Sequence, residues 1–325
     1  MSPRSASLPK TRREEPPVTP SANSEPIEET TGEKLRAFLT AYAPLLVFLG
    51  PTLAVYLFFA IYPTISVVGF SLHKWDGINP VKTWIGLDNY VRMFSDRIFW
   101  EALRNTFVWS AVIVVINVGL GLVIAAMLSR VWRLRLLLQT LIVLPVVISP
   151  IAVATIWRWM YQPDGVINAA LKGIGLDALA RPWLGDPSVV LFALAFAHSW
   201  STIGLSVIIF LAGLQSVSED LYDAARIDGA ITLQSFRYVT LPALRPITAV
   251  VFILTLTAAF KAFDLIWATT QGGPIRFSEI LSTYMYKRGA LENQYGYGAA
   301  IGVALLVIVS LATLIYLKIQ TREDE

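Results

Sequence analysis

The sequence contains no cysteine, only two histidines and few charged residues. Without cysteine the chain forms no disulfide, has no thiol nucleophile and offers no thiolate to a metal. The histidines, His73 and His198, stand alone, so no histidine-rich metal site is expected. The G-x-x-x-x-G-K-[ST] loop that holds nucleotide phosphates is also absent. We therefore expect neither an enzyme nor a bound cofactor, and a net charge of only +3 does not favour nucleic acid as a partner.

Hydrophobic residues are abundant and clustered. They make up 55% of the chain against 15% charged residues, and the mean hydropathy is +0.59. A helix needs roughly 20 mainly apolar residues to cross about 30 Å of hydrocarbon. No long stretch alternates with period two, so a transmembrane barrel is not expected. The sequence predicts an all-α polytopic membrane protein, a bundle of six transmembrane helices at 43–68, 107–128, 136–160, 189–213, 246–269 and 298–319.

The composition divides the chain into three parts. Residues 1–38 are mostly rich in Pro, Ser, Thr and Glu, a composition that buries too little surface to offset the entropy of ordering, and we expect a disordered cytoplasmic tail there. The first transmembrane helix, within 39–72, is too long and too far from Met1 for a signal peptide, so we expect it to be retained. Residues 100–320 hold the other five helices and a charged loop at 214–245.

Positive charge beside the apolar stretches predicts the topology. The short link 129–136 carries Arg130, Arg133 and Arg135 without an acidic residue. Because cytoplasmic loops retain Lys and Arg, this link is expected inside, and six spans then place both termini and the loop 214–245 inside as well. The loop 73–106 is also basic, but acidic residues are interleaved there, and we expect it outside.

The charged loop 214–245 has a helical pattern of its own. Ser216 and Glu219 have the S-x-x-E spacing of a capping box, which predicts a short helix beginning near Ser216. Gly229 is expected to end that helix, because glycine takes a positive φ without steric cost. Thr232 is a suitable cap for a second short helix, and Pro242 marks the turn into the next span.

The loop also matches a known motif. The permease subunits of bacterial ABC importers share the pattern E-A-A-x3-G-x9-I-x-L-P, and this chain is similar to them throughout its spacing, with Asp in place of Glu and Val in place of Ile. The resemblance implies the type I ABC importer permease fold. It also implies that the loop forms two short helices that dock into a groove on an ATPase subunit and transmit its closure. The residues to which it assigns this coupling role are Asp223, Ala224, Ala225, Gly229, Val239, Leu241 and Pro242.

Further motifs resemble the branch of the family that imports maltose, glycerol phosphate and related sugars and polyols. They are Phe263-Asp264-Leu265-Ile266-Trp267, Gly272-Gly273-Pro274 and Tyr295-Gly296-Tyr297-Gly298. The resemblance implies a second permease subunit, two ATPase subunits that carry ATP and Mg²⁺, and an extracellular solute-binding protein that delivers the sugar. It also implies transport by alternating access in the plasma membrane.

Polar residues inside the apolar stretches are candidates for the translocation path, because charged or polar groups there are costly. Lys261 and Asp264 are three residues apart on one face of a predicted helix, so they either pair with each other or line the path. Asn117, Trp200 and Ser201 belong to a polar and aromatic set, with Trp109, His198 and Thr202, that would suit a sugar. Hydrogen bonding between helices is the alternative role for each of them.

Two other classes of protein remain open at this point. An ion-coupled secondary transporter would carry buried acidic residues near the bilayer midplane and repeated halves with broken helices. The only acidic residue in the predicted spans is Asp264, near the end of its span. A membrane sensor or scaffold would keep the loop 214–245 as a docking site without transport.

Overall fold

The computed structural model describes residues 32, 47–130 and 134–323. Two compact units divide it, Met1–Ile61 and Tyr62–Glu325, and the division falls inside the candidate span Val47–Ser71. In the first unit the described residues 47–61 form a helix that ends in a π-helical turn, η1 (Leu57–Ile61), with mostly exposed apolar side chains. The predicted disordered tail, residues 1–38, lies outside the described residues apart from Gly32.

Helices long and apolar enough to cross a membrane account for most of the described chain. Five segments meet this criterion, or six if a bent pair of helices is counted as one span. This confirms the predicted polytopic helical class. The five segments are Val47–Ser71, Arg97–Ser129, Val190–Gln215, Arg245–Thr269 and Tyr295–Gln320.

The third predicted span, 136–160, is not one straight helix but a bent pair. Its two pieces, Arg135–Val147 and Pro150–Met160, meet at an angle of 102°. The first piece is α6 (Arg135–Val143) with a 3₁₀ turn η3 (Leu144–Val147), and the second is α7 (Pro150–Met160). Pro150 has no N–H to continue the helix, and the Ser149 hydroxyl caps the new one by accepting from the Ala152 N–H at 3.3 Å.

The second unit begins with α2 (Tyr62–Ser71) and a two-stranded antiparallel hairpin. Strand β1 (His73–Lys74) pairs with β2 (Thr83–Trp84) in the register His73 to Trp84. Helix α3 (Asp88–Ser95) follows, and then one long span made of α4 (Arg97–Val114), the π-helix η2 (Val115–Leu120) and α5 (Gly121–Arg130). Between α7 and the next span lie the short helices α8 (Val166–Gly173) and η4 (Asp177–Leu179).

Helix α9 (Val190–Gln215) is the central element of the second unit, and it packs against α4, α5, α6 and α13. Glycines allow the closest approaches. A Cβ on Gly204 would lie 2.6 Å from the carbonyl oxygen of Ile142 in α6. A Cβ on Gly213 would lie about 3 Å from the Leu244 and Ile247 side chains. Neighbouring segments of the chain therefore pack tightly against α9 at both Gly204 and Gly213.

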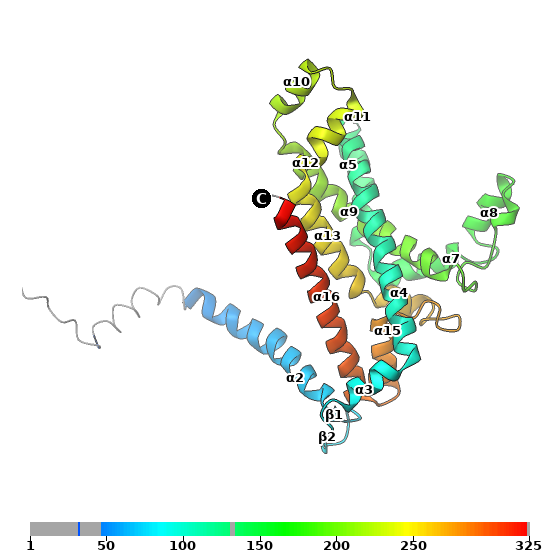
Figure 1. Ribbon diagram of the computed structural model, residues 1–325. Coiled ribbons are helices and arrows are strands. Elements are labelled where there is room, and N and C mark those ends of the chain that lie inside the picture. The colour runs from blue at the N-terminus through cyan, green and yellow to red at the C-terminus, as the bar shows by residue number, and fades with distance from the viewer. Residues whose placement is uncertain (1–31, 33–46, 131–133, 324–325) are drawn as a thin grey trace, which may run out of the picture. The chain divides into compact units, whose positions relative to one another are not determined.

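The last part of the chain runs from one end of the bundle to the other and back. The elements α10 (Glu219–Ile227), α11 (Thr232–Ser235), η5 (Phe236–Thr240) and α12 (Leu241–Ala243) lie at one end (Figure 1). The hairpin and α3 lie at the opposite end. The chain continues through α13 (Arg245–Phe260), α14 (Asp264–Thr269), α15 (Leu281–Tyr286), the π-helix η6 (Lys287–Leu291) and α16 (Tyr295–Glu323).

The helix is broken between α13 and α14, which removes the predicted helical pairing of Lys261 with Asp264. Lys261 ends α13 and Asp264 begins α14, and the residues between them are not helical. Both side chains are exposed, and among the described residues no salt bridge joins them. The three-residue spacing brings two side chains together only while the helix is continuous.

Candidate functional site

Helix α10 begins with a hydroxyl cap, but two residues later than the sequence predicts. The Ser218 side chain accepts from the Asp220 N–H at 3.3 Å, whereas the Ser216 hydroxyl donates back to the Gly213 carbonyl oxygen and ends α9. Glu219 and Asp220 lie in the first turn and Arg226 lies in the last. Each charge therefore has the sign that the helix dipole favours. The predicted cap at Ser216 is wrong because that hydroxyl is used by the preceding helix.

The chain reverses after α10 at Gly229. Its φ is +76°, a left-handed conformation that side chains with a Cβ rarely adopt. The turn is closed by backbone hydrogen bonds from the N–H of Gly229 to the carbonyl of Arg226 at 3.0 Å and from Ala230 to Ala225 at 2.9 Å. A Cβ at Gly229 would meet no atom within 4 Å. Backbone geometry, and not lack of space, is therefore what requires glycine.

The chain after the Gly229 turn packs back against α10 through η5. Ile231 precedes α11, and the Ile231 N–H donates to the Gln234 side chain at 2.8 Å, so the predicted cap at Thr232 is displaced by one residue. The hydroxyls of Tyr222 in α10 and Thr240 in η5 are hydrogen-bonded at 3.0 Å. We call residues 219–243, which include both helices and this link, the coupling knob.

The coupling knob exposes apolar side chains beside charged ones. Ile227 is 87% exposed, and Leu221, Leu233 and Tyr238 are exposed as well. Asp223 forms a salt bridge with Arg226 at 2.7 Å on this surface, and the neighbouring Ala224 leaves room for another surface to approach. Ala225 and Val239 are half-buried, whereas Leu241 and Pro242 are exposed.

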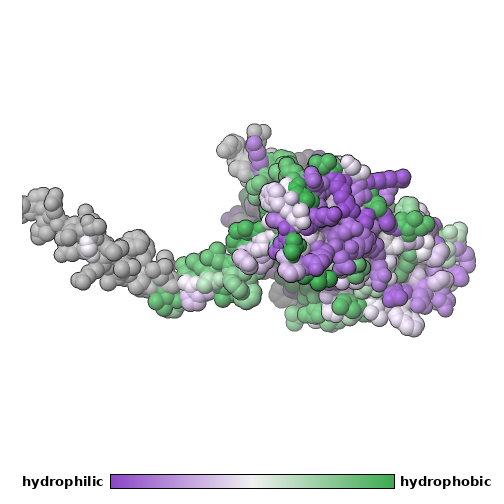
Figure 2. All heavy atoms as spheres, turned by 90° about the horizontal axis from the view of Figure 1, so that it is seen from below, coloured by the Kyte–Doolittle hydropathy of each residue, from purple (hydrophilic) through white to green (hydrophobic). Residues whose placement is uncertain are grey.

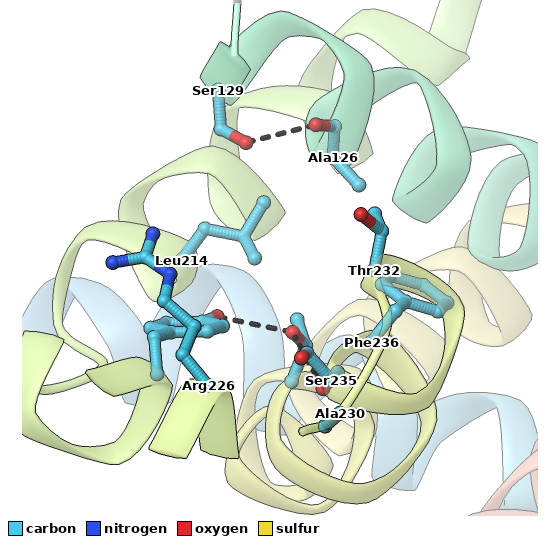
Figure 3. Close-up of a pocket in the computed structure, with 10 residues that line it drawn as sticks. Ala126, Ser129, Leu214, Arg226, Ala230, Thr232, Ser235 and Phe236 are labelled. Atoms are coloured by element: carbon cyan, nitrogen blue, oxygen red, sulfur yellow. Dashed lines mark hydrogen bonds between the residues drawn. The ribbon is translucent and has the colours of Figure 1, made fainter. Parts of the chain in front are cut away.

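A cavity of about 470 Å³ lies between the coupling knob and the ends of two spans (Figure 3). Ala126 and Ser129 of α5 line one side and Leu214 of α9 another. Side chains of the knob, including Arg226 and Phe236, face them across the hollow. The cavity separates part of the knob from the span ends, while Phe236 also packs against the apolar cluster of the bundle.

One residue anchors the knob in the bundle. Leu244, directly after α12, is fully buried in an apolar cluster with Leu122 of α5, Leu211 of α9 and Val251 of α13. Leu244 therefore packs the end of the knob against three spans.

A second, smaller cavity lies among the spans. Its volume is about 90 Å³, and polar side chains from η2, α9 and α13 line it: Asn117, His198, Thr202, Ser206 and Thr255. The Asn117 amide donates to the Thr202 hydroxyl at 2.9 Å, while its own oxygen is buried and accepts no hydrogen bond from the described residues. Asn117 also lies in a π-helical turn, a distortion that is frequent at functional sites.

The other predicted path residues are not part of this cavity. The half-buried Trp200 ring packs edge-on against Trp157, with 5.7 Å between the ring centroids. The Ser201 hydroxyl donates to the His198 backbone carbonyl at 2.8 Å. Trp109 donates its ring N–H to the Ala259 carbonyl oxygen at 3.0 Å and so joins α4 to α13. The sequence did not identify Ser206 and Thr255 as cavity residues. It shows that both side chains are polar, but it does not show which side of its helix each of them occupies.

The end of the bundle away from the knob holds a network centred on Asp96, which the sequence did not reveal. Asp96 caps α4 by accepting from the Ile98 N–H at 2.9 Å, and it also accepts the hydroxyls of Tyr284 and Tyr297. Burial raises the pKa of Asp96, but the hydrogen bonds from both tyrosines and from Ile98 outweigh burial and lower it below 3.8. Burial and the bond to Asp96 raise the pKa of Tyr284 to about 12.

Apolar helices long enough to cross a membrane, a helical knob at one end of the bundle and a small polar cavity among the spans define a polytopic membrane protein. Within the part of the chain that the structure describes, no cluster of side chains suits a metal ion. The chain belongs to the family described as binding-protein-dependent transport system inner membrane component, whose model matches residues 117–324. It is a permease subunit of an ABC importer, and such subunits are not themselves enzymes.

Similar proteins extend this match over most of the chain. A probable ABC transporter permease protein of Bacillus subtilis, YurN, is 37% identical, covering 83% of this chain and 94% of that protein. The trehalose/maltose transport system permease protein MalF of Thermococcus litoralis is 35% identical, covering 83% and 90%. A crystal structure of a bacterial alginate ABC transporter, in complex with an alginate pentasaccharide-bound periplasmic protein, matches with a TM-score of 0.76 and 26% identity, covering 87% and 96%.

Proposed function

We propose that this chain is one of two permease subunits of a plasma-membrane importer for sugars or related polyols, with both termini in the cytoplasm. Two ATPase subunits, which carry ATP and Mg²⁺, bind the coupling knob and its counterpart on the second permease. An extracellular solute-binding protein delivers the substrate, and ATP-driven closure of the ATPases alternates access to the path. The observation that carries this proposal is the knob itself, with exposed apolar residues on one side and a buried anchor at Leu244 on the other.

The knob has the mechanical properties that coupling requires. The Tyr222–Thr240 hydrogen bond and the Gly229 turn hold its two short helices together. Leu244 connects them to α5, α9 and α13. A force applied to Ala224 or Leu233 therefore reaches the spans through packed side chains and not through a flexible loop.

The sugar class is supported by chemistry and by similarity. The mid-bundle cavity presents hydroxyl, amide and imidazole groups, which are suited to the hydroxyls of a sugar or polyol. Its volume of about 90 Å³ corresponds to about three water molecules, too little for a sugar ring. The second permease must therefore supply the rest of the path, and MalF, which is similar to this chain, is named for trehalose and maltose transport.

A bulky residue on the knob tests the docking surface. Ala224 is exposed on α10, so Ala224→Trp should leave the permease folded but obstruct a partner that approaches closely. We expect the ATPase subunits to co-purify with this variant at less than about a tenth of the wild-type amount, a loss of at least ~1.4 kcal/mol of binding free energy.

Ala170→Trp is the matched control, because Ala170 is an exposed alanine on α8, away from the knob. That variant should bind the ATPase subunits normally. If Ala224→Trp also retains the ATPases in full, the knob is not their docking surface, and the proposed coupling role is wrong.

A further inference from the structure

The cavity of about 470 Å³ beside the coupling knob is large enough to hold a small ligand. Ligand sites in proteins have volumes of roughly 300–1,000 Å³, whereas the mid-bundle cavity has only about 90 Å³. Figure 2 shows hydrophilic residues gathered at the end of the second unit away from the knob. Because the apolar spans lie between that end and the knob, the cavity belongs to the other water-facing end of the molecule.

Hydroxyl groups dominate the polar lining of this cavity. They come from α5, α10, α11 and η5: Ser129, Tyr222, Thr232, Ser235 and Thr240. Thr232 and Ser235 lie three residues apart on α11, and neither hydroxyl forms a hydrogen bond with any residue that the structure describes. Thr232 faces Ala126 of α5 across the hollow (Figure 3). Since a hydroxyl donates one hydrogen bond and accepts two, both groups are available to a ligand.

The lining offers a ligand no uncompensated charge. Among the described residues that line the cavity, Arg226 alone is charged, and its guanidinium is paired with Asp223 at 2.7 Å. A phosphate ester would need a cation that is free to pair with it. The aromatic rings of Tyr222 and Phe236 contribute apolar surface beside the hydroxyls. This combination favours a neutral polyhydroxy compound over an anion.

The cavity lies between parts of the chain that meet at the knob. Ser129 belongs to the end of α5 and Leu214 to the end of α9, whereas Thr232 belongs to the knob. A ligand hydrogen-bonded to both Thr232 and Ser129 adds a second connection between the knob and the spans, besides the buried Leu244. Such a connection opposes any movement of the knob past the end of α5.

We propose that this cavity is a regulatory site for the neutral sugar or polyol that the importer releases into the cytoplasm. The inference rests on the proposed function, which places the knob in the cytoplasm and makes a sugar the product. The hydroxyls of Thr232 and Ser235 bind the sugar, and the bound sugar holds the knob against α5. Because Thr232 and Ser129 are exposed and no free charge lines the cavity, binding is weak. The site therefore fills only after sugar has accumulated, and uptake is slowed by its own product.

The test uses the complete importer in liposomes, with the ATPase side outward and the solute-binding protein enclosed with its sugar. The probe is the same sugar added to the bath. ATP hydrolysis is measured as a fraction of each variant's own rate without bath sugar, and the wild type should be inhibited. Thr232→Val combined with Ser235→Ala should raise the half-inhibitory concentration at least about tenfold, because two hydrogen bonds to the sugar are lost.

Ala126→Leu tests the opposite wall of the cavity. Ala126 lies on α5, outside the knob, and a leucine there occupies part of the hollow. This variant should also raise the half-inhibitory concentration. Thr140→Val is the matched control, since Thr140 is an exposed threonine of α6 that does not line the cavity. It should be inhibited at the same sugar concentration as the wild type.

Two results would overturn the proposal. One is a wild type that bath sugar does not inhibit. The other is inhibition at the same concentration in every variant, which would place the inhibitory sugar elsewhere, such as in the translocation path. Failure of the proposed function is a different result, because the enclosed solute-binding protein and sugar would then not stimulate ATP hydrolysis even without sugar in the bath.

Discussion

At the scale of single residues, Asp96 joins the start of α4 to α15 and α16. Its carboxylate caps α4 and accepts the hydroxyls of Tyr284 in α15 and Tyr297 in α16. Arg288 donates to the Tyr284 hydroxyl at 2.8 Å and continues the network into η6. The sequence shows an Asp before a helix, which predicts a cap, but its tyrosine partners are 188 and 201 residues away and nothing local indicates them.

The lowered pKa of Asp96 makes a prediction about pH. A carboxylate whose folded pKa is depressed contributes stability above its ordinary pKa of 3.8 and loses it as pH falls through the folded value. Asp96→Asn should therefore lower the thermal midpoint of the purified transporter at neutral pH. The gap between wild type and variant should close below pH 3.8. Thermal unfolding of both proteins across this range measures it, and a gap that stays constant with pH would contradict the ionised network.

At the scale of elements, hydropathy predicted the existence of the spans better than their shape. The stretch 136–160 has the length and composition of one helix, but Ser149 and Pro150 end one helix and begin another, and the pieces diverge by 102°. Similarly, Lys261 and Asp264 have helical spacing in a segment that is broken between them. Composition reports burial in an apolar medium, whereas a bend depends on the neighbouring helices against which each piece packs.

The close contact of α9 with α6 gives a prediction for Gly204. A Cβ there would lie 2.6 Å from a backbone oxygen, which has no flexible end that could move aside. Gly204→Ala should destabilise the transporter by about 1–3 kcal/mol, the usual cost of overpacking. The measurement is the thermal midpoint in detergent. Gly119→Ala is the control, because a Cβ at Gly119 meets nothing within 4 Å, and equal midpoints for both variants would show that the two helices can separate at low cost.

At the scale of the whole molecule, three features lie in order along the bundle. The Asp96 network is at one end, the polar cavity of Asn117 is among the spans, and the coupling knob is at the other end. The spaced motif located the knob from the sequence alone, because all residues of the knob lie within one short stretch of the chain. The network and the mid-bundle cavity combine residues far apart in the chain, so only the fold could assemble them.

The most direct test of the account is the number of substrate molecules imported per ATP hydrolysed by a Gly229→Val importer in liposomes. Valine opposes the φ of +76° that the turn requires, so the two knob helices lose their fixed angle while the spans stay intact. We predict that ATP hydrolysis continues and import falls at least about tenfold. Gly229→Asn, which tolerates this conformation, should retain most of the import. A wild-type ratio of import to hydrolysis in Gly229→Val would contradict the claim that the coupling knob transmits the ATPase movement.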